Sequence, residues 1–136
     1  LGAPVHVLNT GVPHAVCFVD NLPELDVLKN GAAVRYHSRF APNGTNANFA
    51  AVVSDSHIAI RTYERGVESE TLACGTGMCA AAIIHNLLTD APSPVKVDVA
   101  GGDTLEIGFV KGEDNQFTDV TLCGPADFVF SGSIEI

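Results

Sequence analysis

The sequence predicts an α+β domain in which a mixed, mostly antiparallel sheet wraps around one central, buried helix. Strand-like segments with alternating apolar and polar residues occur both before residue 65 and after residue 90. Between them, residues 75–88 are almost wholly apolar. A helix that is apolar on nearly every side must be surrounded by other elements, so we expect the flanking strands to enclose it.

The bulk composition limits the classes of function. A chain of 136 residues with 46% hydrophobic residues fits one domain, residues 1–136, with a sizeable core. The net charge is −9, and the seven basic residues form no stripe, which argues against nucleic acid and anionic membranes as partners. Without a leader or a membrane-spanning run, the sequence predicts a soluble, cytoplasmic protein. Its four cysteines are too sparse for a disulfide framework and are expected to be reduced.

The first forty residues predict two strands and two short helices. Residues 4–10 and 13–20 alternate in the way that strands do, around a turn at Gly11. Residues 22–31 begin with Leu-Pro-Glu and end at a glycine, which predicts a short helix, and residues 32–40 predict a second one.

The remaining strands are predicted from alternation and turn residues. Residues 46–55 and 57–64 form a predicted β-hairpin around Ser54-Asp55-Ser56. After residue 90, Gly-rich turns separate the segments of a predicted antiparallel sheet. Its four strands are expected at residues 94–100, 103–110, 117–124 and 127–136.

Cys74 stands at the start of the apolar helix, whereas a buried structural cysteine would suit its middle, although a cysteine in a Gly-rich turn before a helix is more often structural than catalytic. The first amides of a helix lack partners within it, and Gly75, Thr76 and Gly77 provide little bulk to cover them. This end of the helix can therefore bind an anion such as a carboxylate. The same oriented amides favour the thiolate of Cys74, which indicates a thiol poised for proton transfer or nucleophilic attack.

Other candidate site residues come from the segments that lead to this helix. Arg65 follows a predicted strand and precedes a glycine, so it can serve as a bidentate carboxylate clamp on a flexible pivot. Glu64 lies beside it. His14 follows a Pro-locked turn, and Asn46 lies at the entrance to a strand, although each could simply satisfy its own turn.

The same residues suggest four other kinds of site or function. Residues 75–80 match G-x-G-x-x-A, but no buried parallel strand precedes them, which excludes a dinucleotide site. A metal site from Cys74, Cys79 and His85 has unsuitable spacing. A cysteine hydrolase that uses His14 stays open. A non-enzymatic carboxylate-binding module, with Cys74 inert, also stays open.

Several segments, taken in order, resemble the C-terminal domain of the diaminopimelate epimerase family. The most specific is TYERGVESETLACGTGMCAAA at residues 62–82. NTGVPHAVCFVD (9–20), PNGTNANF (42–49) and LCGPADFVFSGSIEI (122–136) also follow the family pattern, so the resemblance covers nearly the whole chain.

The resemblance implies an epimerase of lysine biosynthesis that interconverts LL- and meso-diaminopimelate without a cofactor or metal. Two similar domains close over the substrate, and each contributes one cysteine, one acting as base and the other as acid. Cys74 matches the C-terminal member of this pair, and His14 and Glu64 match residues that tune the cysteines. The matching substrate contacts are Asn46, Glu64, Arg65, Gly75 and Thr76. Proline- or hydroxyproline-type racemases share this logic and are the alternative among enzymes.

The chain departs from the family pattern at three points. Val12 replaces a substrate-contacting asparagine, for which Asn9 could compensate, and the loop GVESET (66–71) is one residue longer than the common form. The N-terminal half, with its second cysteine, is absent from the sequence. We therefore expect the chain to need that missing domain as a partner and to be inactive alone. The resemblance also allows a homodimer of the intact protein.

Overall fold

The structure, a computed structural model, describes residues 2–136. Within that range eight strands form one sheet, and neither of the two α-helices is long and apolar enough to cross a membrane. The helices are α1 (Val27–Arg35) and α2 (Gly75–Thr89), with 3₁₀ turns η1 (Ser38–Phe40) and η2 (Glu113–Asn115). The strands are β1 (Val5–Asn9), β2 (Pro13–Phe18), β3 (Asn46–Ser54), β4 (His57–Glu64), β5 (Ser69–Thr71), β6 (Val95–Val99), β7 (Thr104–Lys111) and β8 (Phe117–Cys123).

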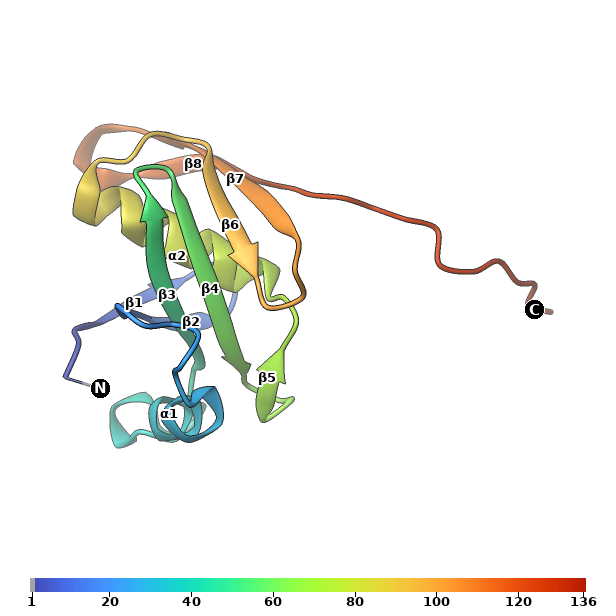
Figure 1. The fold of residues 1–136 in the computed structure, drawn as a ribbon, viewed down its shortest axis with the longest axis horizontal. Helices are drawn as coiled ribbons and strands as arrows, with labels where there is room; N and C mark the ends of the chain where they lie inside the picture. Colours follow the sequence, from blue (N-terminus) through green and yellow to red (C-terminus); the bar gives the residue numbers. More distant parts are fainter. Residues whose placement is uncertain (1) are drawn as a thin grey trace.

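The sheet is mixed and curls around α2, as the sequence predicts (Figure 1). Its order is β1-β2-β3-β4-β6-β7-β8, with β5 paired to β4. The β2–β3 and β4–β6 pairs are parallel, whereas the other pairs are antiparallel. Since α2 packs against all seven strands of the main path, it is enclosed rather than laid on a flat surface.

The main core lies between α2 and the concave face of the sheet. Met78 and the run Ala80–Ile84 are at least 95% buried. They pack against aliphatic side chains of the strands, including Ile58, Val97 and Ile107. Three successive alanines allow the sheet to approach the helix axis closely, which is how one helix can be surrounded by seven strands.

A second core lies on the opposite face, where α1 covers β3 and β4 (Figure 1). The predicted helices 22–31 and 32–40 are corrected here. One helix, α1, runs through Gly31, and only η1 follows it. Gly31 does not end the helix, because its missing side chain makes room for the buried ring of Tyr63.

The predicted strand at residues 127–136 is also wrong. The chain leaves the sheet after β8 and runs outward as an extended tail without secondary structure (Figure 1). The tail has the alternation of a strand, yet Phe128 and Phe130 are fully or nearly fully exposed. A strand pattern alone forms no strand, because the segment must also pair with a neighbouring strand, and here it runs away from the sheet.

The contact between Gly31 and Tyr63 predicts whether an alanine at position 31 stabilises or destabilises the fold. In a helix interior, alanine is normally about 1 kcal/mol more favourable than glycine. Here a methyl group at position 31 would overlap the Tyr63 side chain, so we expect Gly31→Ala to lower the free energy of unfolding by about 1–3 kcal/mol. Urea unfolding measures this change, with exposed Lys29→Ala in the same helix as the control. A stabilised Gly31→Ala variant would contradict the packing.

Candidate active site

The topology brings the predicted site residues to one end of the sheet. Because β2 and β3 are parallel, His14 and Asn46 lie at the same end, and they are register partners. Strand β4 runs antiparallel to β3, so its final residue, Glu64, and the following Arg65 reach that end as well. Helix α2 begins there with Cys74 as its N-cap. Segments separated by some sixty residues of sequence therefore meet at a single locus.

Strand alternation places the polar side chains of this locus on the face toward α2. The alternate residues of the same strands belong to the core under α1. Farther along each strand, this face carries the apolar residues that pack on α2. The polar group therefore lines the open end of the enclosed core. Its members on the strands are His14, Asn46, Asn48, Thr62 and Glu64.

Cys74 is partly exposed and has extended backbone geometry, with φ −135° and ψ 103°. Its carbonyl accepts the first helical hydrogen bond from Met78 N at 2.9 Å. Within residues 2–136 no side chain caps this helix end, which leaves the amide hydrogens of Gly75 and Thr76 for an incoming anion. The thiol therefore lies beside the positive end of the α2 dipole.

His14 is completely buried and reaches Cys74 only through Thr76. Its Nε2 lies 2.8 Å from Thr76 Oγ1, and that oxygen lies 3.9 Å from Cys74 Sγ. Burial, and secondarily the positive charge of Arg65, lowers the pKa of His14 to about 4. A neutral imidazole that contacts a hydroxyl instead of the sulfur is poorly placed to be the direct base of a cysteine hydrolase.

Asn46 holds Arg65 in place. Its Oδ1 accepts from the backbone N of Arg65 at 2.8 Å, and its Nδ2 donates to Pro13 O at 3.1 Å. Asn46 is 4% exposed, so these bonds fix the start of β3 to the turn after β4. One amide hydrogen stays available for a ligand.

The turn that carries Arg65 is tied to the end of α1 by the side chain of Glu68. The carboxylate of Glu68 accepts from Gly66 N at 3.0 Å and from Tyr36 Oη at 2.7 Å, and it pairs with Arg35 at 3.0 Å. These donors, the Gly66 amide foremost, lower the pKa of Glu68 to about 2. Sequence reasoning gave Glu68 no role because two of its partners, Arg35 and Tyr36, lie at the end of α1, some thirty residues earlier.

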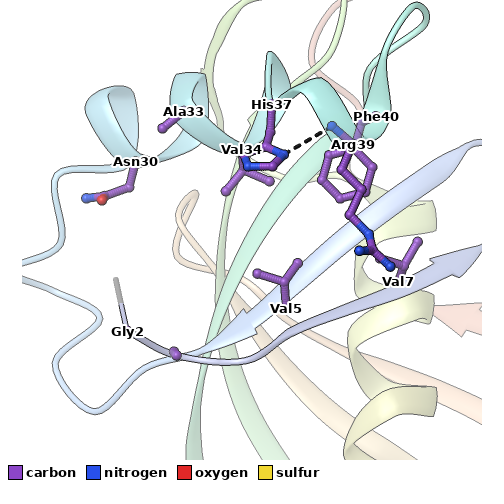
Figure 2. A pocket seen from close by; sticks show the side chains of 10 residues that line it. Gly2, Val5, Val7, Asn30, Ala33, Val34, His37, Arg39 and Phe40 are labelled. Carbon is purple, nitrogen blue, oxygen red and sulfur yellow. Dashed lines mark hydrogen bonds between the residues drawn. The ribbon is translucent and has the colours of Figure 1, made fainter.

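Two cavities of similar size flank β1. One of about 540 Å³ adjoins the start of α2 and is lined by Thr10, Thr76 and Cys79, among others. The other, of about 580 Å³, lies between β1 and the α1–η1 segment, where Val5, Val7 and Phe40 surround it (Figure 2). The second contains none of the predicted site residues, so the first is the one that adjoins the candidate site.

Comparison with known proteins agrees with this arrangement. The sequence pattern of the family described as "Diaminopimelate epimerase" matches residues 6–129. The chain belongs to the diaminopimelate epimerase family.

Relatives named diaminopimelate epimerase match nearly all of the chain. The protein from Chlorobaculum tepidum is 43% identical over 96% of the chain and 50% of its own length. The proteins from Aquifex aeolicus and Hydrogenobaculum sp. are 47% and 48% identical over 93% and 95% of the chain, and 44% and 46% of their own lengths. The chain thus spans about half the length of these relatives.

Solved structures share the fold at low sequence identity. A structure described as a predicted epimerase from Pseudomonas aeruginosa aligns with a TM-score of 0.55, at 15% identity, over 80% of this chain and 36% of that one. A phenazine biosynthesis PhzC/PhzF protein from Clostridium difficile aligns with a TM-score of 0.54, at 20% identity, over 78% and 39%. These likenesses confirm the fold class.

The buried, neutral state of His14 makes stability depend on pH. Its folded pKa of about 4 lies below its ordinary value of 6.5, so between these values only the unfolded chain takes up a proton. This contribution to stability is complete above about pH 6.5 and is lost as the pH falls toward 4. Urea unfolding should show a loss of about 2 kcal/mol between pH 7 and pH 5. His14→Gln, which cannot titrate, should flatten that slope; equal slopes would contradict the assignment.

Proposed function

We propose that this chain is the C-terminal catalytic half of a diaminopimelate epimerase, in which Cys74 exchanges a proton with the α-carbon of the substrate. The reaction interconverts LL- and meso-diaminopimelate in lysine biosynthesis and needs no pyridoxal phosphate. The observation that carries the proposal is the partly exposed thiol of Cys74 at the uncapped start of α2. Family membership supports the same chemistry.

The proposed binding mode follows from the charges at the site. The α-carboxylate of the substrate accepts hydrogen bonds from the amides of Gly75 and Thr76. Arg65, whose guanidinium donates to Asn43 O at 3.2 Å, adds a positive charge at the same end of the sheet, near enough to add to burial in lowering the pKa of His14. Removal of the α-proton produces a carbanion, and donors that are already fixed in place stabilise it without reorganisation. Cys74, at the same helix end, is the group that exchanges the α-proton in this binding mode.

A second domain completes the proposed site. One thiol reaches one face of the α-carbon, whereas inversion requires a proton donor on the opposite face. The relatives are about twice as long as this chain, which is consistent with a second domain that carries the other cysteine. The tail offers a point of attachment, because its exposed apolar residues, among them Phe128, Phe130 and Ile134, fit a strand that pairs outside this domain.

The 136-residue chain alone should show no measurable conversion of LL- to meso-diaminopimelate. A half-site with one thiol lacks the second proton donor, and it leaves the substrate open to water. Chiral chromatography of the amino acid after prolonged incubation measures the conversion, with the intact two-domain protein as the positive control. Substantial turnover by the chain alone would disprove the two-thiol proposal.

In the intact protein, Cys74→Ala should lower the rate of epimerisation at least a hundredfold, because it removes one of two acid–base groups. Incorporation of α-deuterium from heavy water, followed by mass spectrometry, reports proton exchange at the same carbon. Cys123→Ala is the matched control, since Cys123 is exposed on β8 and should leave the rate unchanged. Undiminished epimerisation by Cys74→Ala would refute the catalytic role of Cys74.

A further inference from the structure

A row of buried polar side chains runs behind the candidate site, from β4 through β3 and β2 to the start of α2. Thr62 is 3% exposed, and Asn48 and His14 are completely buried. Polar groups are costly to bury unless they are hydrogen-bonded, and each of these has partners. Thr62 Oγ1 donates to Asn48 Oδ1 at 2.9 Å, and Asn48 Nδ2 lies 3.1 Å from His14 Nδ1.

The orientation of the Asn48 amide is fixed by its neighbours. Its Nδ2 lies 3.0 Å from the carbonyl oxygen of Ala15, which can only accept a hydrogen bond. The nitrogen must therefore face Ala15 and His14, while Oδ1 accepts from Thr62. Gly77 closes over this oxygen, because a side chain at that position would overlap Oδ1. The amide thus has no room or partner for the flipped orientation.

The fixed amide determines the tautomer of His14. Asn48 uses one N–H on Ala15 O and the other on His14 Nδ1, so Nδ1 must be the unprotonated acceptor. In a neutral ring the proton then resides on Nε2, which donates to Thr76 Oγ1 at 2.8 Å. Burial keeps the ring neutral near pH 7, consistent with its lowered pKa of about 4.

The tautomer in turn determines what the Thr76 hydroxyl can do. Since Thr76 Oγ1 accepts from His14, its own hydrogen is free to point elsewhere. Cys74 Sγ lies 3.9 Å from this oxygen, which is a long hydrogen bond. Hydrogen bonds to a charged acceptor are shorter than those to a neutral one, so the distance to a thiolate would be shorter. In general, a hydrogen-bond donor directed at a sulfur stabilises a thiolate more than a thiol.

We propose that Asn48 is a positioning residue of this site: its amide sets the His14 tautomer, which directs the Thr76 hydroxyl hydrogen toward the Cys74 sulfur. Only the effect of this relay on catalysis rests on the proposed function. The relay itself is a property of the fold and can be tested without any turnover. In this arrangement His14 acts as a neutral donor through Thr76 and does not withdraw the thiol proton itself.

The tautomer is measured directly by long-range ¹H–¹⁵N correlation NMR of the ¹⁵N-labelled chain at pH 7. We expect the wild-type spectrum to show protonated Nε2 and unprotonated Nδ1 at His14. In Asn48→Asp, the new carboxylate can only accept, so the proton should move to Nδ1. Thr62→Val is the matched control, since Ala15 O still fixes the amide and the tautomer should not change. A wild-type His14 with its proton on Nδ1 would overturn the proposal, even if Asn48→Asp failed to fold.

The last step of the relay is tested by the rate at which iodoacetamide alkylates Cys74, followed by mass spectrometry of its peptide. Thr76→Val keeps the shape of the side chain but removes the hydroxyl, so the rate at pH 7 should fall about three- to tenfold. Thr76→Ser should restore it, and His14 should keep its tautomer in both variants. Equal rates for wild type and Thr76→Val would overturn the relay. If the intact protein shows these alkylation rates but has no epimerase activity, the relay stands and only the proposed function is refuted.

Discussion

The enclosure of α2 by the curled sheet is the constraint on which the rest of the structure depends. A helix without a polar side must be covered all round, and the run of alanines at its centre lets seven strands approach it. Its first turn lies at the end of the sheet where the candidate site residues gather. The positive end of the helix dipole is therefore surrounded by strand ends, and Cys74 stands between them. The core and the site are two consequences of one packing arrangement.

Around that helix end, each of the buried polar side chains has a hydrogen-bond partner. His14, Asn46 and Asn48 lie in or beside the core, and any one of them left unpaired would cost about 1–3 kcal/mol. Satisfied in this way, His14 contacts the hydroxyl of Thr76, and Asn46 ties down the turn of Arg65. Donors fixed before the substrate arrives need little reorganisation during the reaction, which is the advantage of a rigid polar site.

The parts of the fold that depend on local pattern could be predicted from the sequence. Helix α2 was placed within one residue, and the site positions of Cys74 and Arg65 follow from helix-start and strand-end signals. Long-range contacts could not be predicted in this way. Gly31 resembles a helix stop until Tyr63 is seen against it, and Asn48 resembles any strand residue until the parallel pairing of β2 and β3 brings it to His14. The tail at residues 124–136 has a strand pattern but no partner within the described chain.

The central claim is that the start of α2 binds the α-carboxylate of an amino acid within proton-transfer reach of Cys74. A crystal structure of the intact protein with diaminopimelate tests it most directly. The account predicts carboxylate oxygens within hydrogen-bonding distance of the Gly75 and Thr76 amides, with Cys74 Sγ facing the α-carbon. A substrate bound with its carboxylates away from this helix end, for instance in the cavity between β1 and α1, would contradict it.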